Sequence, residues 1–72
     1  MFRVMIAENK FTEGHQVSRK ETSESAFRSA AYFKGRNKDS VIWIDVVHTY
    51  PMPNGRKFEN YERYLTYYDG SH

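Results

Sequence analysis

The sequence predicts a small α+β domain, in which one helix packs on a mostly antiparallel sheet of three or four strands in the order ββαββ. Three observations predict this class. Residues 41–50, VIWIDVVHTY, are dense in branched and aromatic side chains, which is typical of a strand. Residues 22–35 carry apolar side chains at helical spacing. The remaining segments alternate or contain turn residues, and 72 residues suffice for a single domain.

The first two predicted strands lie before the helix. Residues 2–8, FRVMIAE, place Phe2, Val4 and Ile6 on one side, and this alternation indicates a strand with the Phe2 side facing the core. Residues 9–14 are rich in turn formers. Residues 15–21, HQVSRKE, then return as a second strand. Because Val17 is its only apolar residue, we expect this strand at a sheet edge.

The predicted helix covers residues 23–34. Thr22 or Ser23 can cap its first turn by accepting a hydrogen bond from a free backbone N–H group. Gly35 is typical of the residue that follows a helix end. The apolar face predicted by the spacing consists of Ala26, Phe27, Ala30, Ala31 and Phe33.

Residues 41–50 are predicted as the central strand, which ends before Pro51 because proline cannot donate to a sheet ladder. Alternation places Ile42, Ile44 and Val46 on one face, with His48 and Tyr50 further along it. Trp43, Asp45 and Val47 lie on the other face. A strand that is largely apolar on both sides usually lies inside a sheet. We therefore expect the helix to cover the even-numbered face.

Residues 57–68 can be read in two ways. As a strand they place Phe58, Tyr64 and Tyr68 on one face, and Tyr61, Arg63, Leu65 and Tyr67 on the other. As a helix they form a stripe of Phe58, Tyr61, Leu65 and Tyr68. The strand is favoured because tyrosine and threonine prefer sheets and because Asn54-Gly55 predicts a hairpin return. Residues 70–72 are predicted to be a loose tail.

The overall composition indicates the compartment of the protein and the kinds of partner that it permits. Cysteine is absent, so we expect a cytoplasmic protein without disulfides. No apolar run approaches the roughly 20 residues that span a membrane, and the N-terminal residues lack the pattern of a signal peptide. Eleven Lys and Arg residues against nine Asp and Glu give a net charge of +2, which permits a nucleic-acid partner without arguing for one.

The sequence lacks the patterns that most chemistries need. A metal site would have to use His15, His48 and His72 with Asp45, and these residues do not have the spacing of a zinc site. Asp45 and His48 are three apart on one strand and therefore point to opposite faces. No serine lies in a nucleophile elbow, and no glycine-rich phosphate loop is present. We therefore expect that the protein is not an enzyme and that it binds neither a metal nor a cofactor.

The second face of the predicted sheet is the candidate binding site. Clustered Trp, Tyr and Arg side chains have the composition of interaction hot spots. Asp45 in the same row suggests that part of this face meets water, because a buried carboxylate needs a partner. In the alternative interpretation, the C-terminal segment folds over and buries Trp43. The predicted contact residues are Trp43, Val47, Tyr61, Arg63 and Tyr67.

Two basic groups are candidate phosphate contacts: Lys34, Arg36 and Lys38, and the pair Arg56-Lys57. Each also has an ordinary structural explanation. The first group complements the negative end of the helix dipole, and the second makes a hairpin soluble.

The layout is similar, in size and order of elements, to several very small phage-encoded inhibitors such as some anti-CRISPR proteins. This resemblance implies a binding role and transfers no residue. We therefore expect a small non-catalytic module that binds a protein partner, as an inhibitor or regulator, through the aromatic sheet face or an exposed strand edge. Homodimer formation through the same face is a variant. The alternative is a nucleic-acid-binding module in which sheet aromatics stack on bases and Arg or Lys side chains meet phosphates.

Overall fold

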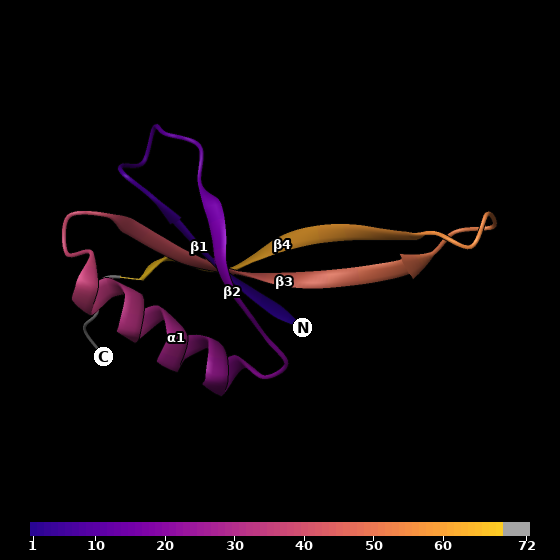
Figure 1. Ribbon diagram of the computed structural model, residues 1–72, viewed down its shortest axis with the longest axis horizontal. Helices are drawn as coiled ribbons and strands as arrows, with labels where there is room; N and C mark the ends of the chain where they lie inside the picture. The colour runs from indigo at the N-terminus through magenta and orange to yellow at the C-terminus, as the bar shows by residue number, and fades with distance from the viewer. Residues whose placement is uncertain (69–72) are drawn as a thin grey trace.

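The computed structural model describes residues 1–68, with side chains through residue 66, and shows one helix packed on a four-stranded antiparallel sheet (Figure 1). The ββαββ prediction is confirmed. The elements are β1 (Phe2–Ala7), β2 (His15–Lys20), α1 (Ser23–Arg36), β3 (Val41–Pro51) and β4 (Lys57–Tyr68). The strand order is β2-β1-β3-β4, so β3 lies inside the sheet and β2 at its edge, as predicted. The predicted tail at residues 70–72 lies outside the described residues.

The core lies between α1 and one face of β1 and β3. Val4 and Ile6 of β1 pair with Ile44 and Ile42 of β3, and all four side chains are buried. Ala26 and Ala30 of α1, both fully buried, close this layer. Because alanine carries only a methyl group, the helix can approach the sheet closely. The helix therefore covers the even-numbered face of β3, as the alternation predicts.

The ends of α1 show which capping signals the chain uses. The Thr22 side chain accepts a 3.1 Å hydrogen bond from the backbone N–H of Ser25, as an N-cap does. The helix extends to Arg36, two residues beyond the predicted range 23–34, and Asn37 rather than Gly35 follows its last turn. The Asn37 backbone N–H donates to the carbonyls of Phe33 and Lys34, and its side-chain amide also donates to Phe33. The helix end is thus satisfied without a left-handed glycine.

Residues 57–68 form a strand, and its pairing contains an irregularity that alternation could not predict. Ile44 pairs with Leu65 and Asp45 with Arg63, so Tyr64 is an extra residue opposite β3. A second shift follows nearer the C-terminal end of β4. The prediction that Leu65 shares the Trp43 face is wrong, because the bulge moves Leu65 to the helix side, where it packs against the core.

The β3–β4 hairpin extends beyond the rest of the sheet as a two-stranded arm (Figure 1). β1 pairs with β3 only at residues 41–46, and the last link on that side is the Val47 N–H donating to the Met1 carbonyl. Beyond it, β3 pairs with β4 alone. At the tip, the Met52 N–H donates to the Arg56 carbonyl at 2.7 Å, and Gly55 adopts a φ of +83°. Glycine at this place in a three-residue hairpin loop avoids the strain that a side chain would meet there.

Candidate binding surfaces

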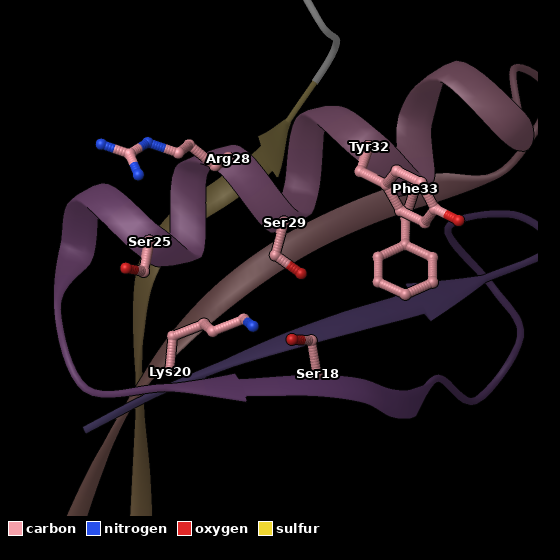
Figure 2. A pocket seen from close by; sticks show the side chains of 7 residues that line it. All are labelled: Ser18, Lys20, Ser25, Arg28, Ser29, Tyr32 and Phe33. Carbon is pink, nitrogen blue, oxygen red and sulfur yellow. The ribbon is translucent and has the colours of Figure 1, made fainter.

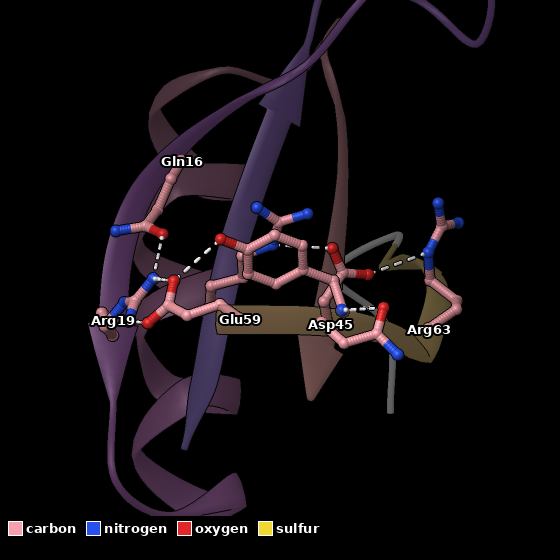
Figure 3. A network of polar contacts seen from close by, with 8 residues as sticks. Gln16, Arg19, Asp45, Glu59 and Arg63 are labelled. Atoms are coloured by element: carbon pink, nitrogen blue, oxygen red, sulfur yellow. Dashed lines mark hydrogen bonds and ion pairs between the residues drawn. The ribbon is translucent and has the colours of Figure 1, made fainter. Parts of the chain in front are cut away.

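A buried carboxylate organises the sheet face opposite α1. Asp45 is 4% exposed, and register places it between Arg3 of β1 and Arg63 of β4. Arg3 Nε donates to Asp45 Oδ2 at 2.9 Å, and Arg63 Nε donates to Oδ1 at 3.1 Å (Figure 3). Part of this face meets water, as expected, since Tyr61 and Arg63 are partly exposed, but Asp45 itself does not. Two guanidinium groups satisfy its oxygens in place of water.

Both of these arginines also lie over aromatic rings. The guanidinium carbon of Arg3 is 3.4 Å from the centre of the Tyr61 ring, and that of Arg63 is 4.9 Å from the Trp43 ring centre. These distances are those of cation–π contacts. Trp43 itself is half-buried, with Gly14 of the β1–β2 connection against its six-membered ring. The indole is therefore neither fully enclosed nor open, and β4 runs beside β3 rather than folding over it.

A second ionic contact on this face joins strands that are not neighbours. Arg19 of the edge strand β2 donates to both carboxylate oxygens of Glu59 on β4, at 2.7 and 3.1 Å (Figure 3). The Tyr61 hydroxyl donates to the same carboxylate at 2.8 Å. These hydrogen bonds, Arg19 first and Tyr61 second, lower the pKa of Glu59 to about 2. The same contact raises the pKa of Arg19 above its ordinary value.

The predicted contact residues on this face differ in how accessible they are. Val47 is buried, and Trp43 is half-buried under Gly14 and Arg63. Tyr61 and Arg63 keep about two fifths of their surface exposed, 41% for Tyr61 and 42% for the Arg63 side chain. The Tyr67 side chain lies outside the described part of the structure. The face brings the predicted Trp, Tyr and Arg together, but within a network that already uses their polar and π groups.

The two basic groups do not form one patch. Lys34 donates to the carbonyls of Lys38 and Ser40 at 3.1 and 2.7 Å, and so closes the α1–β3 connection. The Arg36 guanidinium lies 5.2 Å from the Tyr32 ring centre. Arg56 and Lys57 are exposed at the tip of the arm. The groups occupy opposite ends of the longest axis of the molecule, which measures 43 Å (Figure 1).

The arm carries exposed apolar residues that the sequence interpretation did not single out. Tyr50 and Phe58 are direct cross-strand partners and are 49% and 54% exposed, and Met52 beside them is 43% exposed. Another exposed aromatic, Phe11, lies in a turn where its backbone N–H donates to the Asn9 side chain. A difference in strand length could have predicted the arm. The first predicted strand has seven residues and cannot pair with all ten residues of the central strand.

The described part of the chain, residues 1–68, gathers no cluster of metal-ligating side chains. His48 faces Glu62, with Nε2 3.2 Å from Oε2, on the side of β3 opposite Asp45, as the alternation predicts. No group of three or more His, Asp or Glu side chains in this range can hold a metal ion. His72 lies outside it. No helix in the described part of the chain has both the length and the apolar character needed to cross a bilayer.

Comparison of the chain with models of protein families, with curated proteins and with solved structures found no match.

Proposed function

We propose that this chain is a non-catalytic binding module for a protein partner and that it makes contact through the β3–β4 arm. The observation that carries the proposal is the exposure of Tyr50, Met52 and Phe58 on a ribbon that projects past the sheet. The proposal includes an inhibitory or regulatory role in the cytoplasm, of the phage or mobile-element type, in keeping with the small size and the absence of cysteine.

The energetics of the arm support contact with a partner. A two-stranded ribbon is marginally stable by itself in water, and grouped large apolar side chains on a small domain are typical of interaction sites. Between Thr49 and Glu59, both outer edges of the ribbon lack a partner strand among the described residues. A strand of the partner can add to either edge, while Tyr50 and Phe58 enter pockets on its surface.

The sheet face around Trp43 is the second contact in this proposal. Tyr61 and Arg63 are of the residue types enriched at hot spots, and their contacts with Arg3, Asp45 and Trp43 hold them in place before binding. Such preorganisation reduces the entropy lost on association. The arm ranks first because its apolar side chains are exposed, whereas Val47 and much of Trp43 are covered.

The test compares two aromatic substitutions. In a Tyr50→Thr/Phe58→Thr variant, strand propensity is retained while both apolar rings are lost. We expect partners recovered by affinity purification from the native host to be lost, and a purified partner to bind at least tenfold more weakly by calorimetry. Phe11→Thr removes a ring that is even more exposed, at 97%, from the β1–β2 turn and should leave binding unchanged. Recovery of the same partner at the same affinity by a folded double variant would refute the arm as the contact.

The arm tip also favours a second candidate, nucleic-acid binding. From residue 49 to residue 58 the chain has no acidic side chain, and Arg56 and Lys57 adjoin Phe58 and Tyr50. Such a ribbon can place cations on phosphates and rings against bases. If this candidate is correct, a labelled single-stranded oligonucleotide binds the protein with an affinity that falls steeply with salt, and Arg56→Gln/Lys57→Gln reduces the slope. Absence of binding at low salt removes the candidate.

A further inference from the structure

A groove separates α1 from the edge strand β2 on the helix side of the sheet (Figure 2). Its volume is about 450 Å³, within the range of roughly 300–1,000 Å³ typical of ligand sites. Lys20 and the hydroxyls of Ser18 and Ser29 face the gap, whereas Arg28 extends outward from α1 (Figure 2). The lining residues are Ser18 and Lys20 of β2, and Ser25, Arg28, Ser29, Tyr32 and Phe33 of α1.

Three of the side chains that line the groove are serines, and these small side chains leave space between α1 and β2. Ala26 and Ala30 seat the helix on β1 and β3. Ser25 and Ser29 precede them by one position each and are therefore turned toward β2, where Ser18 is also small. Phe33, which packs against the core, closes one end. The space is thus a product of how the helix is seated and not of a missing residue.

The chemistry of the lining favours a negatively charged group. Serine hydroxyls, one amine and one guanidinium line the groove, and no carboxylate does. Within the described chain, no hydrogen bond or ion pair uses the side chains of Lys20 or Arg28. A carboxylate entering beside Lys20 would gain charge-assisted hydrogen bonds without displacing an internal partner.

The free edge of β2 identifies the form of the occupant. β2 pairs with β1 on one side, and no strand among residues 1–68 pairs with its other side. A chain that adds to this edge extends the sheet, and every second side chain of the added strand points toward the helix side. The groove lies on this helix side, so these side chains would enter it. A compact anion would fill the space without using the edge, whereas an extended segment uses both.

We propose that the groove between β2 and α1 binds an extended acidic segment of a partner protein, which adds to β2 as a fifth strand with a carboxylate at Lys20. This site is separate from the β3–β4 arm. Its test therefore does not depend on the function proposed for the arm, and either can fail alone.

The probe is a seven-residue peptide, blocked at both ends, that alternates Glu with Val. Titrated into isotopically labelled full-length protein, it should shift the backbone amides of β2 and of the first three turns of α1, and leave those of residues 50–58 in place. Lys20→Glu should weaken the affinity at least tenfold. Ser29→Leu, which fills the groove with a good helix former, should abolish binding while circular dichroism and the melting temperature show a folded protein.

The controls distinguish specific binding of the acidic peptide in the groove from nonspecific electrostatic attraction. Lys38→Glu makes the same charge change outside the groove and should leave the affinity within twofold. A peptide with Lys in place of Glu should not bind. The proposal is overturned if no amide shifts at millimolar peptide, if Lys20→Glu binds as the unchanged protein does, or if free glutamate or an oligonucleotide produces the same shifts at the same concentration.

Discussion

The two carboxylate oxygens of Asp45 link β3 to both of its neighbouring strands. Each of its oxygens accepts from a different arginine, one on β1 and one on β4, so the carboxylate bridges both neighbours of β3. The side chains of Arg3 and Arg63 are 19% and 42% exposed, and can return to water if the carboxylate is lost. The carboxylate, which is almost fully buried, has no such alternative. The network is therefore more sensitive to change at Asp45 than at either arginine.

Asp45→Asn is expected to lower the free energy of unfolding by about 1–3 kcal/mol, because a buried acceptor of two charged donors becomes a neutral amide that also places a donor there. Urea unfolding followed by circular dichroism measures the change. Asp39→Asn, at an exposed position in the α1–β3 connection, should remain within about 0.5 kcal/mol of the unchanged protein. Equal effects of the two substitutions would contradict the bridging role of Asp45.

Gly14 permits the position of Trp43. A methyl group added at Gly14 would lie 2.3 Å from the outer edge of the indole ring, so either the ring or the loop must move. Gly14→Ala should destabilise the fold by about 1–3 kcal/mol and shift the tryptophan emission. Gly35→Ala, where nothing lies within 4 Å and the residue is helical, should instead stabilise by about 0.5–1 kcal/mol with unchanged emission. An unperturbed emission spectrum in Gly14→Ala would argue against this contact.

At the scale of elements, the bulges of β4 decide which side chains reach which layer. The extra residue Tyr64 turns toward the helix side, where its ring lies 5.0 Å from that of Phe2 and 6.0 Å from that of Phe27. Arg63 stays on the opposite face with Asp45. Bulges increase local twist, and a twisted sheet is consistent with Arg19 on β2 reaching Glu59 on β4 across two intervening strands. This contact joins the two edge strands directly.

The link between β2 and β4 predicts a specific dependence on pH. The pKa of Glu59 is about 2 in the fold and 4.5 in its absence, so its contribution to stability is complete above about pH 4.5 and is lost as the pH falls toward 2. The difference in unfolding free energy between the unchanged protein and Glu59→Gln should shrink across that window. The side chains that face Glu59 are those of Arg19, Tyr61 and Arg3.

Nuclear magnetic resonance titration of the Glu59 carboxyl gives an independent check. Its midpoint should lie near 2 in the unchanged protein, and Arg19→Gln should move it upward toward 4.5 because the main hydrogen-bond donor is gone. A midpoint that Arg19→Gln leaves in place would show that Arg19 does not control this group.

At the scale of the whole molecule, the layered part and the arm are unequal in what they contribute to folding. The molecule extends 43 Å along one axis and 16 Å along its shortest. The buried apolar residues lie in β1, α1 and β3 up to Val47, whereas Tyr50, Met52 and Phe58 lie beyond. The arm therefore adds little to the core, and its apolar side chains stay available for the partner contact proposed above.

Replacing residues 50–58 with Asn-Gly, which joins the cross-strand partners Thr49 and Glu59 through a two-residue turn, should leave the domain folded. We expect the free energy of unfolding to stay within about 1 kcal/mol, since the segment removed has no fully buried side chain and the loop becomes shorter. Urea unfolding and the amide spectrum of β1 and α1 measure this. Loss of cooperative unfolding would show that the arm is part of the core.

The sequence by itself determined the order of the elements, the central place of residues 41–50 and the side of that strand on which the helix packs. These follow from alternation and helical spacing, as seen at Ala26, Ile42 and Ile44. Both are local patterns that do not depend on how distant segments pack. Only the tertiary structure decided that Leu65 joins the core, that Asp45 is held by arginines 42 positions before it and 18 after it, and that Tyr50 and Phe58 remain uncovered. These outcomes depend on bulges, on register and on where neighbouring elements end, and such contacts between distant segments leave no periodic trace in the chain.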